Sequence, residues 1–177
     1  MKVEPIDKKF KDCVHYICAH GRTSLGAVKL NKILWFLDAG SYVQFGKSVT
    51  GSKYIRRKNG PVPQKILRAL EELVKDGRIA IGQSQVGPYI KKDFVSLVEP
   101  DTSSLSKEEM EIMTYLIEEI CEHHTANSIS EATHNIIWEA AIEGEEIPLE
   151  ATLAAIPGEI TNKHTTWADT LINKRAA

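Results

Sequence analysis

Four cations within six residues form the segment of this chain best suited to binding chemistry. Lys53, Arg56, Arg57 and Lys58 precede a Gly-Pro-Val-Pro stretch that begins at Gly60. Lysine and arginine neutralise phosphate groups, and they also attract acidic protein surfaces. The segment therefore predicts contact with either nucleic acid or an acidic protein, and the elements around it have to favour one of the two.

Sequence motifs of catalytic sites are absent. The chain contains no GxGxxG, GxxxxGK[ST], HExxH or GxSxG pattern. This absence removes the usual support for dinucleotide, phosphate-loop, zinc-protease and acyl-transfer chemistry. We therefore expect no catalytic residues, no cofactor and no enzymatic activity.

A metal site is not expected either. The one cluster of potential ligands is Cys121-Glu122-His123-His124, with His134 ten residues further on. Adjacent residues of a helix point about 100° apart, so neighbouring histidines do not face the same ion. A structural zinc site also needs two closely spaced ligand pairs. We interpret these histidines as helix-end residues, where they suit the negative pole of the helix dipole.

The composition is that of one globular domain. The chain has 177 residues, 42% of them apolar and 26% charged, which is enough for a single core. No run of about 18 apolar residues and no secretory apolar segment is present, which predicts a cytoplasmic protein without a membrane partner. The three cysteines form no CxxC pair and are expected to be reduced.

Charge is distributed unevenly along the chain. Residues 1–100 carry 18 Lys and Arg against 9 Asp and Glu, a net charge of +9. Residues 101–177 carry 4 against 15, a net charge of −11. This asymmetry predicts either an acidic partner for the first half or attraction between the two halves.

Helical periodicity dominates the first half. Apolar residues recur at intervals of three and four over 7–20, 23–46 and 63–77. Thr23 and Ser24 are expected to cap the second helix, which is apolar nearly all round and should be the most buried one. The third helix is expected to begin at 63, because a proline in the first turn loses no hydrogen bond.

Short strands are indicated between these helices and after them. Residues 52–57 alternate polar and apolar side chains as an edge strand does. Residues 78–81 and 89–98 are predicted to form a hairpin, or wing, around a polar loop.

Helices return in the second half. S-x-x-E capping boxes at 106–109 and 128–131 predict two helix starts, the second leading towards residue 138. A last helix is expected to begin at 147–148 with a proline in its first turn.

The predicted fold class is α+β and mainly α, a compact helical domain with a short strand and a small β-hairpin in an outline that resembles a winged helix. Residues 1–157 are expected to form this single domain, and residues 158–177 a C-terminal tail with the apolar residues for a short docking helix.

A winged-helix DNA-binding regulator is therefore the alternative function. Carboxylates repel phosphate, and two of them lie on the solvent face of helix 63–77. That mixed face comprises Gln64, Lys65, Arg68, Glu71, Glu72 and Lys75.

Several separated stretches resemble one family. They are KLNKILWF at 29–36, NGPVP at 59–63, LVKDGRI at 73–79, and ISEATH at 129–134 with Trp138 and EEIP at 145–148 after it. In this order, and over about residues 10–155, they are similar to the Panacea domain, also called the SocA-like domain.

The resemblance implies an antitoxin. Members of that family occur beside small toxin genes in bacteria and prophages and neutralise very different toxins by direct protein contact, and one is a proteolytic adaptor that delivers its toxin to a cytoplasmic protease. The implied partners are a cognate toxin and, for an adaptor, a protease. Nucleic acid is less favoured because of the mixed charge of helix 63–77. Some relatives carry a separate DNA-binding domain for which this chain has no room, which counts against autoregulation by this protein alone.

The family also marks motif positions, most of which we expect to determine the fold and not to touch a partner. These positions are Lys29, Leu30, Asn31, Lys32, Trp35, Gly60, Pro61, Pro63, His134 and Trp138. Asn59 stands where the family more often has tyrosine, and the tail at 158–177 extends past the family's pattern.

We interpret Gly-Pro-Val-Pro as a joint that leads the chain out of a strand and into a helix. The four cations before it would then lie on an exposed edge. Our hypothesis is that they attract an acidic toxin surface; the alternative is that they attract the acidic second half of the chain itself.

Overall fold

The computed structural model describes residues 6–155, and its fold is α+β and mainly helical, as predicted. The helices are α1 Lys8–His20, α2 Ala27–Phe45, α3 Ile66–Lys75, α4 Lys107–His123, α5 Ala126–Glu131 and α6 Ile136–Ala140, with 3₁₀ turns η1 Arg22–Ser24 and η2 Leu149–Ala155. The strands are β1 Tyr54–Arg57, β2 Gly60–Pro63, β3 Ile79–Val86, β4 Tyr89–Ser96 and β5 Glu146–Ile147.

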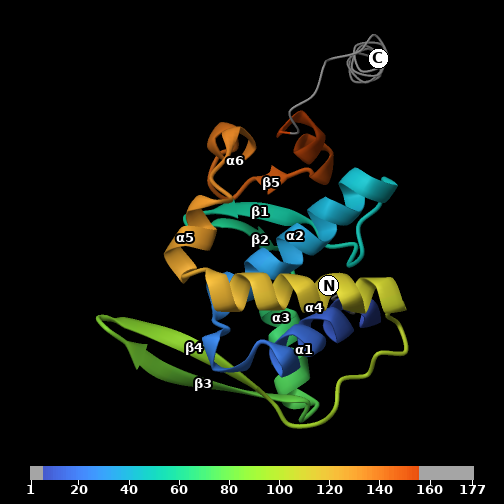
Figure 1. The fold of residues 1–177 in the computed structure, drawn as a ribbon, viewed down its shortest axis with the longest axis vertical. Coiled ribbons are helices and arrows are strands. Elements are labelled where there is room, and N and C mark those ends of the chain that lie inside the picture. Colours follow the sequence, from blue (N-terminus) through green and yellow to red (C-terminus); the bar gives the residue numbers. More distant parts are fainter. Residues whose placement is uncertain (1–5, 156–177) are drawn as a thin grey trace, which may run out of the picture.

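Helix α2 lies at the centre of the fold (Figure 1). It contacts α1, α4, α5 and strand β2, so it is covered on several sides. Leu30, Ile33, Leu34 and Leu37 are buried in the main core, as the nearly continuous apolar character of this helix predicts. A second, smaller core joins Trp35 of α2 to the sheet that contains β1.

The predicted start of α4 and the predicted end of α2 are confirmed, and the predicted start of α2 is wrong. Ser106 and Glu109 form the capping box of α4, and α2 ends at Gly46 in a left-handed conformation. Thr23 and Ser24 do not cap α2, which begins at Ala27. Leu25 has an extended backbone and a fully buried side chain, so it packs in the core between η1 and α2 and the helix begins after it.

The Gly-Pro-Val-Pro stretch forms a strand, and the prediction that a helix begins at Pro63 is wrong. Residues 60–63 are β2, which pairs antiparallel with β1, and α3 begins only at Ile66. The strand order is β2-β1-β5, so β2 lies at an edge. Strand β1 was predicted as an edge strand, but it is the central strand because it pairs with both β2 and β5. An edge strand tolerates proline, and a spacing of two places both missing N–H groups on the same side of the strand.

The hairpin is longer than predicted. Strands β3 and β4 pair without interruption from Ile79↔Ser96 to Val86↔Tyr89, and only residues 87–88 form the turn. The polar residues at 82–85 were interpreted as a loop, but they are part of β3. Both faces of the outer hairpin are exposed to water, so a strand with polar side chains is stable there. The wing projects from the helical body (Figure 1).

The last part of the described chain folds into shorter elements than predicted. Thr125, and not Ser128, caps α5, and Ser128 provides the second half of that capping box. Asn135 starts a separate helix, α6, that contains Trp138. The segment at 147–148 begins no α-helix, because Ile147 pairs with Tyr54 in β5 and a 3₁₀ turn follows.

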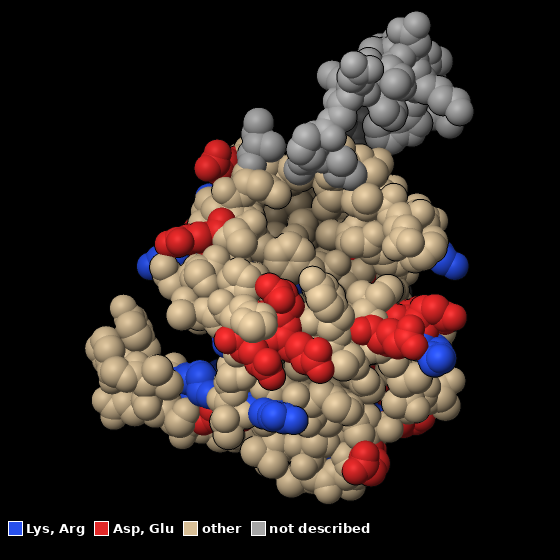
Figure 2. Space-filling view, in the orientation of Figure 1, with Lys and Arg blue, Asp and Glu red and all other residues tan. Residues whose placement is uncertain are grey.

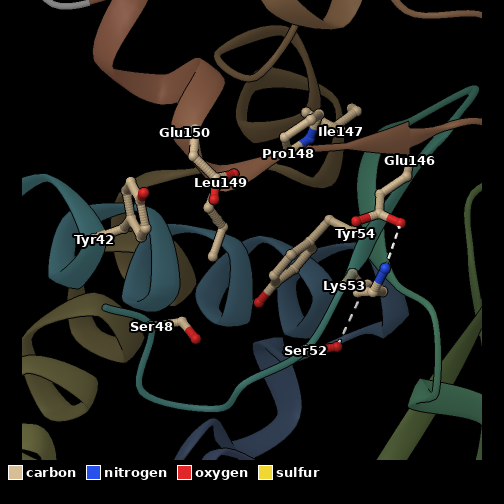
Figure 3. Close-up of a pocket in the computed structure, with 10 residues that line it drawn as sticks. All are labelled: Tyr42, Ser48, Ser52, Lys53, Tyr54, Glu146, Ile147, Pro148, Leu149 and Glu150. Carbon is tan, nitrogen blue, oxygen red and sulfur yellow. Dashed lines mark hydrogen bonds and ion pairs between the residues drawn. The ribbon is translucent and has the colours of Figure 1, made fainter. Parts of the chain in front are cut away.

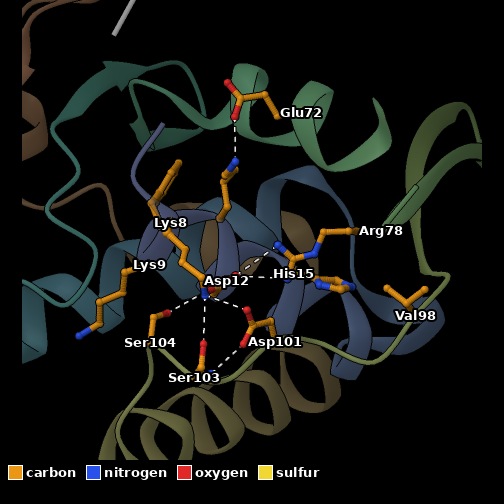
Figure 4. A network of polar contacts seen from close by, with 12 residues as sticks. Lys8, Lys9, Asp12, His15, Glu72, Arg78, Val98, Asp101, Ser103 and Ser104 are labelled. Carbon is orange, nitrogen blue, oxygen red and sulfur yellow. Dashed lines mark hydrogen bonds and ion pairs between the residues drawn. The ribbon is translucent and has the colours of Figure 1, made fainter. Parts of the chain in front are cut away.

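A buried carboxylate fastens α1 to its neighbours (Figure 4). Asp12 is fully buried and accepts hydrogen bonds from Lys8 at 2.6 Å, Ser104 at 2.7 Å and the Arg78 guanidinium at 3.2 Å. These partners come from α1, the start of the wing and the loop before α4. Since a buried charge needs such partners, Asp12 fixes the base of the wing against α1.

The predicted tail lies outside the described residues. Within residues 6–155, no helix combines the length and the apolar character needed to cross a bilayer. In the same part of the chain, no three side chains of the metal-binding types are grouped to hold an ion.

Candidate protein-interaction surface

The motif positions come from three parts of the chain that meet in the fold. Five lie on α2 and three on β2, while His134 lies between α5 and α6 and Trp138 lies in α6. Helix α2 contacts both β2 and α5. We call the meeting of α2, the β1–β2 turn and α5–α6 the motif junction.

Lys32 and Gly60 form the centre of the motif junction. Lys32 is 1% exposed, and its ammonium group donates a hydrogen bond of 3.4 Å to the carbonyl of Pro61. Burial lowers the pKa of Lys32 to about 7. Gly60 has a φ of 100°, and a Cβ there would lie less than 3.0 Å from both Lys32 Nζ and Thr133 Oγ1. Only glycine fits at this position.

Helix α5 is attached to the β1–β2 turn by the hydroxyl group of Ser130, and the Thr133 hydroxyl closes the end of α5. Ser130 donates to the carbonyl of Asn59 at 2.9 Å, and Thr133 donates to the carbonyl of Ser130 at 2.8 Å. Both hydroxyl-bearing residues are buried. Asn59 therefore takes part through its backbone, which any residue at that position supplies.

Trp138 joins α6 to strand β1. Its indole N–H donates to the carbonyl of Arg57 at 3.1 Å, and its own carbonyl accepts from Arg56 Nε at 3.0 Å. The Arg56 guanidinium lies 4.0 Å from the indole centroid, and the His134 ring stacks on the indole at 3.8 Å. These contacts hold two motif positions, His134 and Trp138, against the basic segment.

The four predicted partner-binding cations are not equally exposed to a partner. Lys53 forms an ion pair with Glu146 at 2.9 Å, and Arg56 lies 3.9 Å from Glu143. Both acids belong to the acidic second half of the chain. Arg57 and Lys58 are exposed and have no ion pair with any residue of 6–155.

The remaining polar motif residues on α2 face α4 or the interior. Lys29 is buried and donates to the carbonyl of Cys121 at 3.2 Å, in the last turn of α4. The side-chain oxygen of Asn31 is buried and has no hydrogen-bond partner within the described residues. Lys29 thus satisfies a helix-end carbonyl, which is a structural role.

One buried polar cluster was not predicted from the sequence. Asp38 is fully buried and accepts from the backbone N–H groups of Val49 and Thr50 at 2.9 and 2.8 Å, and from the Thr50 hydroxyl. Tyr54 Oη lies 2.7 Å from Asp38 Oδ2 and from the carbonyl of Leu34. Burial raises the pKa of Asp38 against these hydrogen bonds. An aspartate in the apolar middle of α2 was the available signal.

A polar hollow of about 210 Å³ lies beside this cluster (Figure 3). Tyr42 of α2, Lys53 and Tyr54 of the β1 segment, and Glu146 and Glu150 of the last segment line part of it. Its charged groups include the Lys53–Glu146 ion pair, so part of its polarity is already satisfied inside the protein.

The acidic half of the chain shows on one face of the molecule. Acidic side chains gather over the face that α4 crosses (Figure 2). Glu108, Glu111, Glu118 and Glu122 of α4 are exposed. This face repels a phosphate backbone, so a nucleic acid would have to bind elsewhere.

Most of the chain, including nearly all of the motif positions, matches one protein family. Residues 30–139 match the family model described as antitoxin SocA-like, Panacea domain. The match runs from within α2 to within α6 and includes every motif position except Lys29. The chain belongs to this antitoxin family. Neither the search of curated proteins nor the search of solved structures finds a significant match.

Proposed function

We propose that this protein is an antitoxin that neutralises a cognate small toxin by binding it directly. The observation that carries the proposal is the family match over residues 30–139. A binding role also agrees with how the motif residues are used. Most of them pack inside the fold at or beside the motif junction, so they build a framework whose exposed surfaces are left for a partner.

The proposed partner surface includes the edge formed by Lys53, Arg56, Arg57 and Lys58. Lys53 and Arg56 already have acidic partners in the second half of the chain. Arg57 and Lys58 are the two that remain for an acidic toxin surface, and charges of this kind raise the association rate and select the partner. Trp138 and Glu143 hold Arg56 in place beside them.

The mode of neutralisation has two forms under this proposal. Binding alone would block the toxin, whereas a proteolytic adaptor would also present it to a cytoplasmic protease. Both forms place the protein in the cytoplasm, and neither requires catalysis. A toxin whose half-life falls when the antitoxin is present would identify the adaptor mode.

DNA binding is less well supported than protein binding. In a winged-helix reader, α3 would have to enter a groove of DNA. Leu67, Glu71 and Val74 of α3 are exposed, and an apolar and acidic face suits a phosphate-lined groove poorly. Two charges of the predicted mixed face are also paired within the protein, since Glu72 lies 3.1 Å from Lys11 and 3.6 Å from Arg68.

Affinity purification of the tagged full-length chain from its native host tests the proposal. The eluate is analysed by mass spectrometry and by its ratio of absorbance at nucleic-acid and protein wavelengths. A small protein recovered in near-equal amount is the expected result. Nucleic acid without such a protein, in an amount that falls steeply with salt, would contradict it and favour the DNA-binding alternative.

A further inference from the structure

An apolar groove lies between α3 and the wing, away from the motif junction. Its volume is about 400 Å³, and Leu67, Leu70 and Val74 of α3 and Ile81 of β3 form its floor. Glu71, Lys75 and Lys92 provide its charged groups. We call this the α3 groove. None of its residues takes part in the interactions described for the motif junction.

The groove exposes apolar side chains that the fold does not need to expose. Leu67 is 64% exposed, Val74 43% and Ile81 39%. The adjoining part of the apolar face of α3, with Ile66, Ala69 and Leu73, is already buried in the core. Helix α3 therefore has one wide apolar face, and the core covers only part of it. A contiguous exposed apolar surface of this kind is typical of an interaction site.

The shape of the groove favours a helix as its occupant. Residues 67, 70 and 74 follow one another at helical spacing and form a row along α3. Helix α3 has ten residues, so the row lies on an element about 15 Å long. An amphipathic helix of about three turns presents apolar side chains at i, i+3 or i+4, and i+7, which matches such a row.

The charges of the groove favour an acidic helix. Lys75 and Lys92 are exposed and have no ion pair with a residue of 6–155, and Glu71 is the single carboxylate among the groove residues. The groove is thus net positive around an apolar floor. A nucleic acid would meet the positive charges but would leave the floor uncovered, whereas an amphipathic helix with acidic flanks satisfies both.

We propose that the α3 groove binds an amphipathic helix of the toxin whose apolar ridge covers Leu67, Val74 and Ile81 and whose flanks carry Asp or Glu near Lys75 and Lys92. This inference rests on the proposed antitoxin function and names the chemistry of the partner segment. The toxin would then contact two areas of this protein, the α3 groove and the exposed cations Arg57 and Lys58.

The test measures binding of the full-length chain to the small protein that is recovered with it. Leu67→Glu places a charge on the apolar floor and is expected to weaken binding roughly tenfold or more. Phe45→Glu is the matched control, because Phe45 is 59% exposed at the end of α2, outside the groove. Thermal melts of both variants should match that of the wild type, since neither side chain belongs to the core.

Two single charge changes test the acidic character of the partner. Lys92→Glu is expected to weaken binding and Glu71→Lys to strengthen it, with both effects reduced at high salt. A photo-crosslinking amino acid at position 67 should link to an apolar segment of the toxin that has acidic residues on its flanks. The same amino acid at position 45 should give no link.

The possible outcomes separate the groove from the antitoxin function. A toxin that binds the wild type and Leu67→Glu equally, and does not crosslink to position 67, would overturn the groove proposal and leave the antitoxin function standing. A wild-type chain that dimerises alone, with Leu67→Glu monomeric, would assign the groove to self-association and overturn the proposal. Recovery of no small protein would overturn both the groove and the function on which it rests.

Discussion

The ammonium group of Lys32 occupies the space that a side chain at residue 60 would need. Gly60 therefore leaves room for the buried end of the Lys32 side chain as well as providing a backbone conformation with a φ of 100°. Both residues are motif positions, and they lie 28 residues apart in the sequence. The geometry explains why a lysine on α2 and a glycine in a strand belong to the same motif.

Gly60→Ala should destabilise the protein strongly. The new Cβ would overlap Lys32 and Thr133, and alanine is strained at this φ, so we expect the free energy of unfolding to fall by about 2–4 kcal/mol. Urea unfolding measures the change. Gly51→Ala is the control, because φ is 65° there but no atom lies within 4 Å of the added Cβ, and it should cost about 1 kcal/mol.

Lys32 should make stability depend on pH in a defined window. Its folded pKa of about 7 lies below the ordinary value of 10.5, so the folded protein favours the neutral amine. The unfolded chain then binds more protons between these two values, and stability rises with pH from about 7 upwards, by at most about 1.4 kcal/mol per pH unit. Below pH 7 the full cost of burying the charge is present.

Lys32→Met isolates this contribution. Urea unfolding of the wild type and of the variant at pH 6, 7 and 8 should show the wild type gaining stability relative to Lys32→Met between pH 7 and 8. Measurements stay below pH 9, because Cys13 and Cys18 affect stability above it. Burial raises the pKa of these two thiols from 9.0 to about 12, so stability falls as pH rises through this range. Parallel curves for the two proteins would show that Lys32 keeps its proton in the fold.

Trp138→Ala should loosen the attachment of α6 to β1. The substitution removes the ring that contacts Arg56 and His134, as well as the N–H that bonds to Arg57. We expect a loss of about 1–3 kcal/mol, since the ring is only partly buried. Glu143→Gln removes just the 3.9 Å ion pair of Arg56 and should change stability by less than about 0.5 kcal/mol. Equal effects of the two substitutions would argue against the role given to the indole.

Asp38→Ala should be more damaging than Asp38→Asn. Alanine leaves the buried N–H groups of Val49 and Thr50 without their acceptor, at a cost of about 3 kcal/mol or more. Asparagine keeps one oxygen for these donors, and Tyr54 can still donate to the carbonyl of Leu34. Circular dichroism during urea unfolding ranks the two variants. If Asp38→Asn lowers the free energy of unfolding as much as Asp38→Ala does, the second carboxylate oxygen is the one that stabilises the cluster.

Arg57→Glu combined with Lys58→Glu should weaken toxin binding without unfolding the domain. Both side chains are exposed, so the expected effect is a slower association, of about tenfold at low salt and less at high salt. Lys47→Glu combined with Lys107→Glu, at two other exposed positions, is the control for the same change in net charge. Surface plasmon resonance measures the association rate. An unchanged rate would show that Arg57 and Lys58 are not part of the toxin interface.

The sequence predicted the parts of the fold that local signals determine. The capping box at Ser106 and Glu109 lies within four residues, and the apolar character of α2 is visible along one segment. Strand β2 could not be found in this way, because Gly-Pro-Val-Pro forms a strand only through its pairing with β1. The short strand at Ile147 likewise depends on Tyr54, more than 90 residues earlier.

The site was predicted as a set of residues but not as a geometry. The motif positions were identified, yet the sequence does not show that Lys32 lies against Gly60 or that Trp138 contacts Arg56. These relations are set by tertiary contacts between α2, β1 and α5–α6. The cluster of Asp38, Thr50 and Tyr54 was missed for the same reason, and the α3 groove becomes visible only when the exposed fractions of Leu67 and Val74 are known.

Growth of cells that co-express this chain with the small protein recovered beside it is the most direct test of the antitoxin function. The small protein alone should stop growth, and the full-length chain should restore it, with the two proteins co-purifying as one complex. Growth that stays arrested in the presence of the folded chain, or a small protein that is harmless by itself, would contradict the antitoxin function.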